Sequence, residues 1–245
     1  LLNREVALKS PTPAAKTPAP PEQLLIEAQI TSLLDHPGVV PVYDVGRDEA
    51  GQFFYTMRVV SQPNLADLLT DGGRPLGGKQ IEDWVLALKQ ACLTVQYAHD
   101  HGVIHRDIKP QNILLGGYGE VYVVDWGMAR VVDETLGLKR TNVEPDGQVI
   151  GTLRYMSPEQ LTGSHSSVDK RSDVYSLGAV LYFILTGTSP FVQESVIALR
   201  EAVLSTEPIL PHKRVLGRQI PIMLSEICMR ALNKEPNDRF QSAKE

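Results

Sequence analysis

The segment DVYSLGAVLYFILTG, at residues 173–187, constrains the fold more than any other stretch of the sequence. It is apolar on nearly every side at helical spacing, so it predicts a helix buried in the middle of a large lobe. Its longest apolar run, residues 177–185, has about half the length that a membrane span needs. We therefore expect a large helical lobe and no membrane segment in this chain.

Length and composition allow one large core or two unequal lobes. The chain has 245 residues, of which 42% are hydrophobic and 22% are charged. A formal net charge of -5 provides no broad basic field for nucleic acid or an anionic membrane, so any phosphate binding must be local. The two cysteines, Cys92 and Cys228, lie in amphipathic patterns and predict buried thiols. They favour a reducing compartment, and we expect a cytoplasmic location.

The first 60 residues predict a small, mostly β lobe. Stretches at residues 6–9, 39–46 and 52–60 are alternating or rich in β-branched and aromatic residues, which indicates strands. A proline-rich loop ends near Pro21 and should lead into a helix that stops before Pro37.

From about Leu65 onward, helical patterns dominate. The residues 81–99 have an apolar face that predicts a helix, and residues 221–232 predict a later amphipathic one. Between them, residues 112–125 read as two strands around a glycine-rich turn. The larger lobe is thus expected to be helical with one short hairpin.

The stretch VIHRDIKPQNILL carries the most chemistry. Asp107, Lys109 and Asn112 share one short loop between a helix and the hairpin, and the far hairpin strand leads to Asp125. Carboxylate and amide oxygens suit Mg²⁺, which usually bridges substrate phosphates. Phosphoryl transfer needs such a metal, a cation that holds the polyphosphate and a base for the attacking hydroxyl.

Five collinear motifs resemble those of protein kinases. HRDIKPQN, DWG, SPE at residues 157–159, DVYSLG and NDRF occur in that family's order and spacing, over essentially the whole chain. The chain is most similar to bacterial, eukaryotic-like serine/threonine kinases. The resemblance implies an α+β, two-lobed fold, with a small β-rich N-lobe at residues 1–60 and a helical C-lobe at residues 61–245.

The resemblance also implies the catalytic roles. Lys9 would hold the α- and β-phosphates of ATP, and Glu27 would be its ion-pair partner. Asp107 would accept the proton of the substrate hydroxyl, and Lys109 would steady the transferred phosphoryl group. The implied cofactors are ATP and Mg²⁺, and the metal ligands would be Asn112 and Asp125.

Further residues are assigned to nucleotide and substrate by the same resemblance. Adenine would stack against Ala7 and Leu114, Met57 would be the gatekeeper, and the backbone of Arg58 and Val60 would hydrogen-bond the base. Lys109 together with Thr152 is similar to the serine/threonine pattern, which implies protein serines and threonines as substrates.

Other residues are expected to be framework. By resemblance, His105 and Asp173 would brace the catalytic loop, and Glu159 and Arg239 would form a buried ion pair. The remaining histidines lack metal-ligand spacing and are expected to be caps, turns or surface residues: His36, His99, His101, His165 and His212.

The polar stretch between Gly127 and Ser157 is too long for a passive connector, and by resemblance it is the activation segment. Arg106 would receive a phosphate on this segment, which would order the loop. Thr141 is the preferred acceptor and Thr135 the second choice; ordering by packing alone is the alternative.

The chain departs from the family pattern at both ends. Eight residues precede Lys9 and none is glycine, so the glycine-rich loop over the phosphates is missing, and the last helix should still be running at Glu245. We expect a fragment of low activity. A catalytically impaired pseudokinase or scaffold is the alternative function. A small-molecule phosphotransferase is disfavoured, because SPE, Thr152 and Arg239 belong to the peptide-binding apparatus of protein kinases.

Overall fold

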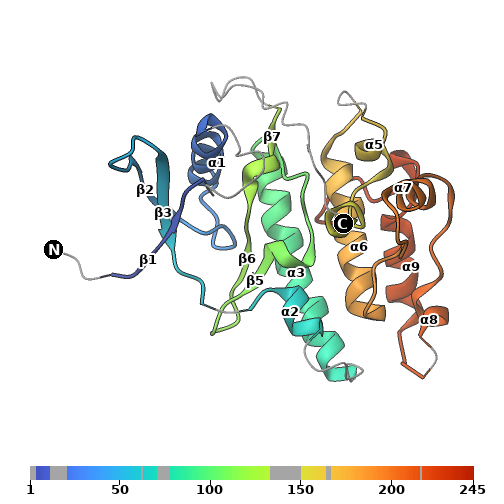
Figure 1. Cartoon of the computed structure of the whole chain (residues 1–245). Coiled ribbons are helices and arrows are strands. Elements are labelled where there is room, and N and C mark those ends of the chain that lie inside the picture. The colour runs from blue at the N-terminus through green and yellow to red at the C-terminus, as the bar shows by residue number, and fades with distance from the viewer. Residues whose placement is uncertain are drawn as a thin grey trace.

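The small lobe is a three-stranded antiparallel sheet with one helix against it. In a computed structural model, β1 (Val6–Lys9), β2 (Val42–Arg47) and β3 (Phe53–Arg58) pair in the order β1-β3-β2. Helix α1 (Pro21–Leu33) packs on β2 and β3 (Figure 1). The structure describes residues 4–11, 21–61, 63–70, 78–132, 150–163, 167–215 and 217–245.

The predicted strands and helix of this lobe are confirmed, with one shift. The second strand begins at Val42 rather than near Val39, because Val39 instead makes a parallel bridge to Val123 in the large lobe. The backbone N–H of Val123 also donates to the carbonyl oxygen of Gly38 at 2.8 Å. These contacts join the chain after α1 to the hairpin that carries the predicted metal ligand.

The large lobe is mostly helical, as expected. Its helices are α2 (Leu65–Thr70), α3 (Gly78–Asp100), α4 (Ile150–Leu153), α5 (Pro158–Leu161), α6 (Lys170–Thr186), α7 (Val196–Ser205), α8 (Pro211–Arg214) and α9 (Ile222–Ala231). Short strands form two antiparallel pairs, β4 (Val103–Ile104) with β7 (Arg130–Val131), and β5 (Ile113–Leu115) with β6 (Val121–Val123). Single 3₁₀ turns are η2 (Pro110–Asn112), η3 (Trp126–Met128) and η5 (Pro236–Asp238).

Helix α6 is the centre of this lobe. It packs against α3 on one side and α9 on the other, and nearly all of its residues are buried (Figure 1). A Cβ added at Gly178 would lie 2.6 Å from the Cβ of Ala231, so glycine is required where α6 and α9 approach. Gly187 ends the helix in the left-handed conformation, at φ 78°. The prediction of a fully buried helix is confirmed.

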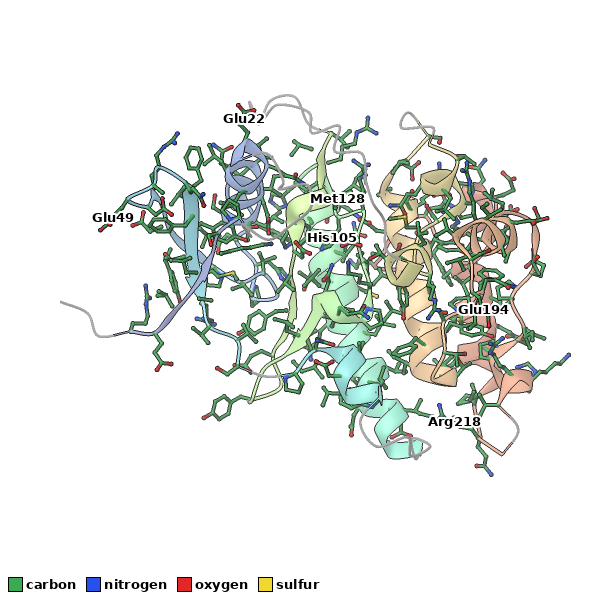
Figure 2. The ribbon with its side chains drawn as sticks, in the orientation of Figure 1. Glu22, Glu49, His105, Met128, Glu194 and Arg218 are labelled. Carbon is green, nitrogen blue, oxygen red and sulfur yellow. The ribbon has the colours of Figure 1, made fainter. Side chains whose placement is uncertain are left out.

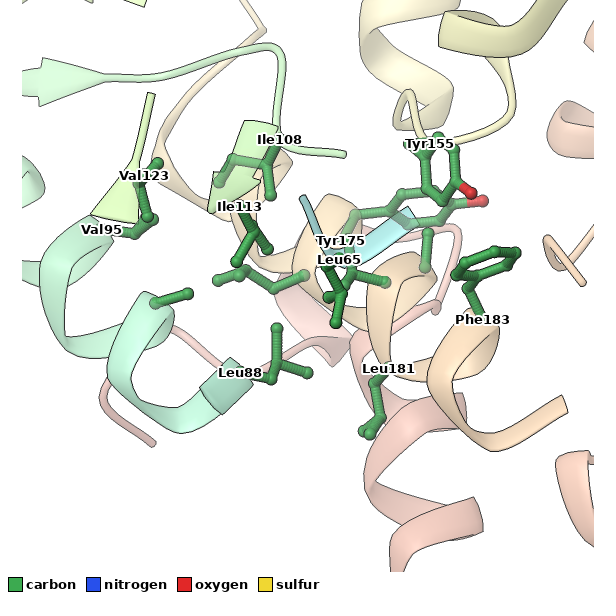
Figure 3. Close-up of a cluster of buried hydrophobic side chains, with 14 of the residues drawn as sticks. Leu65, Leu88, Val95, Ile108, Ile113, Val123, Tyr155, Tyr175, Leu181 and Phe183 are labelled. Carbon is green, nitrogen blue, oxygen red and sulfur yellow. The ribbon is translucent and has the colours of Figure 1, made fainter. Parts of the chain in front are cut away.

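The buried core anchors the segment that carries the predicted chemistry. Ile108 lies between Asp107 and Lys109, Ile113 follows Asn112, and both are at most 2% exposed. They belong to one apolar cluster with Leu65 and Tyr175 (Figure 3). The polar residues beside them, Asp107, Lys109 and Asn112, are therefore anchored by the packed core.

Neither cysteine forms a disulfide. Cys92 is half-buried, Cys228 is buried, and burial raises the pKa of the Cys92 thiol to about 12. Across the described parts of the chain, no helix combines the length and the apolar character that a membrane span requires.

Candidate active site

A cavity of about 390 Å³ separates the sheet of the small lobe from the β5–β6 hairpin of the large lobe. Each residue that the sequence assigned to the nucleotide side lines it: Ala7, Lys9, Met57, Arg58, Val60 and Leu114. Glu27, Asn112 and Asp125 also reach this cavity. Side chains from both lobes therefore meet around one space.

Lys9 bridges two carboxylates at the inner end of the cavity. Its Nζ donates to Glu27 Oε1 at 2.5 Å and to Asp125 Oδ1 at 3.1 Å. Burial disfavours the ammonium, but the two carboxylates outweigh it and hold the pKa of Lys9 above its usual value. Burial likewise opposes the ionisation of Asp125, but Lys9 keeps the pKa of Asp125 below the ordinary value. The site thus holds one cation and two anions.

Asp107 and Lys109 lie in the loop of residues 105–112, which corresponds by resemblance to the catalytic loop of protein kinases and is given that name below. Lys109 Nζ donates to Asp107 Oδ2 at 2.7 Å and lies 3.5 Å from Thr152 Oγ1. Asn112 Nδ2 donates to the backbone oxygen of Asp107 at 2.8 Å and to its Oδ2 at 3.1 Å. The loop therefore presents a carboxylate, an ammonium and an amide at one place.

The residues present fit a magnesium ion. Asp125 and Asn112 both line the cavity, and the Asp125 side chain is 44% exposed to it. Because Asn112 Nδ2 donates to Asp107, its amide oxygen is the atom left to bind a cation. Mg²⁺ usually takes few ligands from the protein and completes its coordination shell with water and phosphate oxygens, so two side-chain oxygens are enough. Asp125 has left-handed backbone geometry, at φ 66°, which is uncommon for a non-glycine residue and which clusters at functional sites.

The backbone of the catalytic loop is held by Asp173 of α6. Its carboxylate accepts hydrogen bonds from the backbone N–H groups of His105 and Arg106, both at 2.8 Å. Arg106 is left-handed at φ 68°, and its carbonyl oxygen accepts from Gln160 Nε2 at 2.7 Å. Burial opposes ionisation of Asp173, but His99 and these donors keep its pKa below the ordinary value.

The expectation that His99 is a cap, turn or surface residue is wrong. Its side chain is 1% exposed, and its Nε2 donates to Asp173 Oδ2 at 2.7 Å. Helix α3 thus braces α6, and through Asp173 it braces the catalytic loop. A histidine near the end of a helix resembles a capping residue in sequence, and the packing of α3 on α6 gives it this other role.

His105 and Trp126 connect residues 105–107 with the end of the β5–β6 hairpin, at residues 123–126. His105 Nε2 donates to the oxygen of Val124 at 3.1 Å, and its Nδ1 accepts from the backbone N–H of Asp107 at 3.2 Å. Its ring lies 4.5 Å from that of Trp126, whose indole N–H donates to the oxygen of Val123. In the view of Figure 2, His105 lies in the middle of the molecule.

Glu159 and Arg239 form a buried bidentate ion pair. Arg239 Nη1 donates to Glu159 Oε1 at 2.7 Å, and Nη2 donates to Oε2 at 2.8 Å. Ser172 also donates to Glu159, at 2.7 Å. Burial raises the pKa of Glu159, but Arg239 outweighs it and the net pKa is lowered. The pair joins α5 to the chain after η5.

Thr135 and Thr141, the predicted phosphate acceptors, lie outside the described residues. The expected receiver, Arg106, is buried, and its Nε has no hydrogen-bond partner in the described part of the chain. Burial and the nearby charge of Arg130 lower the pKa of Arg106. Two arginines therefore lie close together beside the catalytic loop.

Sequence reasoning missed three residues of the site. His99 braces Asp173, Gln160 holds the carbonyl of Arg106, and the Tyr55 hydroxyl donates to Glu27 Oε1 at 2.9 Å. Gln160 had a signal in the sequence, because it stands three residues after Ser157 in a capping box. For Tyr55 the strand pattern indicated only an aromatic position.

Comparisons with known proteins place the chain among protein kinases. The family model described as "Protein kinase domain" matches residues 2–245. The serine/threonine-protein kinase PknB of Mycobacterium leprae is 39% identical over 249 residues, which cover 100% of this chain and 38% of that protein. A probable serine/threonine-protein kinase of Streptomyces coelicolor, SCO3848, is 37% identical over 248 residues, which cover 100% of this chain and 35% of that protein.

A more distant relative gives the same picture. The serine/threonine-protein kinase PknD of Protochlamydia amoebophila is 32% identical over 262 residues, which cover 99% of this chain and 26% of that protein. The chain thus spans well under half the length of these curated relatives.

Proposed function

Because the chain belongs to the protein kinase domain family, we propose that it transfers the γ-phosphate of ATP to serine and threonine hydroxyls of proteins. The observation that carries this proposal is the meeting of Lys9, from the small lobe, with Asn112 and Asp125, from the large lobe, around one cavity. We place the boundary between the lobes after residue 60.

The cavity walls suit a nucleotide. Ala7 and Leu114 would sandwich the adenine, Met57 would close its inner side, and the backbone of Arg58 and Val60 would hydrogen-bond its edge. Lys9, held by Glu27, would bind the α- and β-phosphates. Bound Mg²⁺ would neutralise the phosphates, with Asn112 and Asp125 as its protein ligands.

Asp107 and Lys109 would act on the transferred group. The Asp107 carboxylate would orient the substrate hydroxyl and accept its proton, and Lys109 would stabilise the charge on the phosphoryl group. Lys109 also lies 3.5 Å from Thr152, at the start of the segment that leads to SPE, and this contact supports a serine or threonine substrate. ATP use and two free thiols favour the cytoplasm.

We further propose regulation by phosphorylation of Thr141, with Thr135 as the second candidate. Arg106 supports this, because a buried guanidinium with an unsatisfied Nε, close to another arginine, suits a phosphate. Binding there would act directly on the residue that precedes Asp107.

The test is phosphate transfer from radiolabelled ATP to a basic generic protein and to the kinase itself, followed by mass spectrometry of the products. The natural full-length protein should modify serine or threonine, and Asp107→Asn should reduce the rate by about 10²–10⁴-fold. Equal, background rates for the wild type and Asp107→Asn would instead indicate an inactive scaffold. Phosphate on small molecules alone would indicate a small-molecule phosphotransferase.

A further inference from the structure

Tyr55 and Lys9 are direct cross-strand neighbours that contact the same carboxylate oxygen. In the antiparallel pairing of β1 with β3, Lys9 lies opposite Tyr55, so both side chains leave the sheet on one face. Lys9 Nζ lies 2.5 Å from Glu27 Oε1, and the Tyr55 hydroxyl donates to the same atom at 2.9 Å. Glu27 is thus held from the sheet by two donors.

The Tyr55 hydroxyl is a permanent donor. Tyr55 is 3% exposed, and burial followed by the charge of Glu27 raises its pKa far above the ordinary value. It therefore remains protonated throughout the physiological range. A buried carboxylate is costly without donors, and a hydrogen bond to a charged group is stronger than one between neutral groups.

Lys9 divides its hydrogen bonds between Glu27 and a second acceptor. It also donates to Asp125 at 3.1 Å, and its side chain is 35% exposed toward the cavity where the phosphates would bind. Each acceptor added there draws the ammonium away from Glu27. The neutral hydroxyl of Tyr55 donates to Glu27 and has no competing acceptor in the described part of the chain, so it keeps one hydrogen bond on Glu27 whatever Lys9 does.

Glu27 lies on α1, so holding its side chain in place also holds the helix in place. This helix packs on β3 and on η3, and Gln23 Nε2 donates to the oxygen of Gly127 at 3.3 Å. A Cβ at Gly127 would come within 3.2 Å of Glu27 Oε2, so the carboxylate lies close against the turn that follows Asp125. Movement of Glu27 would therefore displace α1 from both the sheet and the metal-ligand turn.

We infer that Tyr55 is a positioning residue, whose hydroxyl keeps Glu27 and α1 in the ATP-binding arrangement before the nucleotide arrives. This rests on the proposed kinase function. Without the hydroxyl, a larger share of molecules has α1 displaced, and the apparent affinity for ATP falls by that share. Saturating ATP shifts the population back to the competent arrangement. Loss of the hydroxyl should therefore raise KM for ATP and leave kcat nearly unchanged.

Tyr55→Phe in the natural full-length protein removes the hydroxyl and keeps the ring. We expect KM for ATP to rise about tenfold, while kcat stays within about twofold. In a Glu27→Ala background the same change should have no further effect, because the acceptor is gone. Tyr182→Phe is the matched control: its hydroxyl donates to the oxygen of Ile209 at 2.8 Å, and its loss should leave KM unchanged.

Hydrogen exchange of the α1 amides provides a readout that needs no catalysis. Tyr55→Phe should speed exchange across α1, and Tyr182→Phe should not. Wild-type α1 exchange in Tyr55→Phe, or equal KM values for Tyr55→Phe and wild type, overturns the inference. If the wild type transfers no phosphate, the proposed function fails, and the exchange experiment still decides whether Tyr55 positions α1.

Discussion

The carboxylate of Asp173 holds Arg106 in a left-handed backbone conformation. The Arg106 N–H donates to Asp173 Oδ1 at 2.8 Å, and its φ is 68°. Left-handed geometry in a branched-chain or long side-chain residue costs of order 1–3 kcal/mol and persists only where the surroundings impose it. The residue next to the predicted base is therefore shaped by a helix that lies far along the sequence.

Asp173→Ala should destabilise the protein strongly. It leaves the His99 side chain and the N–H groups of His105 and Arg106 without their acceptor. We expect the free energy of unfolding to fall by about 3 kcal/mol or more, because each buried donor left unsatisfied costs about 1–3 kcal/mol. Urea denaturation measures this.

Asp169→Ala is the control for that variant. Asp169 caps the same helix by accepting from the backbone N–H of Arg171, and loss of such a cap costs about 1 kcal/mol. Equal losses in the two variants would show that Asp173 acts only as a helix residue.

Gln160→Ala should lower activity more than stability. Its Nε2 donates to the Arg106 carbonyl oxygen at 2.7 Å, so the substitution removes one of the hydrogen bonds that hold Arg106 in its left-handed conformation. A small misplacement of Asp107 can cost on the order of a hundredfold in rate. We expect kcat to fall about tenfold or more, with a loss of about 1 kcal/mol in unfolding free energy. An unchanged kcat would contradict this role.

The Glu159–Arg239 pair predicts non-additive losses. Glu159→Gln or Arg239→Met alone leaves a buried group without its partner and should cost about 3–5 kcal/mol in unfolding free energy. The double variant Glu159→Gln with Arg239→Met should lose less than the sum of the two. Strict additivity in a double-mutant cycle would argue against a direct interaction.

Stability should fall in acid. Asp125, Glu159 and Asp173 have lowered pKa values in the folded protein, so the unfolded chain binds protons more tightly than the folded one. Their stabilisation is present above the ordinary carboxyl pKa, about 4, and is lost as the pH falls through the lowered values. Unfolding free energies measured from pH 7 down should begin to decline below about pH 5. A flat profile would contradict the pKa directions.

Much of the fold was predictable because its signals are local. The alternation before Lys9, the apolar segment of α6 and the glycine-rich turn of the hairpin each set one element through its own residues. The family resemblance then ordered these elements. The start of β2 was missed because Val39 is an equally good strand residue, and its bridge to Val123 depends on contacts between the lobes.

The site residues that the sequence did not reveal depend on contacts between residues far apart along the chain. His99 looks like a helix-end residue until α3 and α6 pack together and bring it 2.7 Å from Asp173. Tyr55 becomes a partner of Glu27 only through the register that sets it opposite Lys9. Strand register is a property of the assembled sheet, so the sequence of β3 alone could not reveal it.

The most direct test of the central claim is an experimental structure of the protein with Mg²⁺ and a non-hydrolysable ATP analogue. The account predicts the adenine between Ala7 and Leu114, the phosphates beside Lys9, and the metal on Asp125 and Asn112. A nucleotide bound outside this cavity, or phosphates that contact none of these side chains, would contradict it.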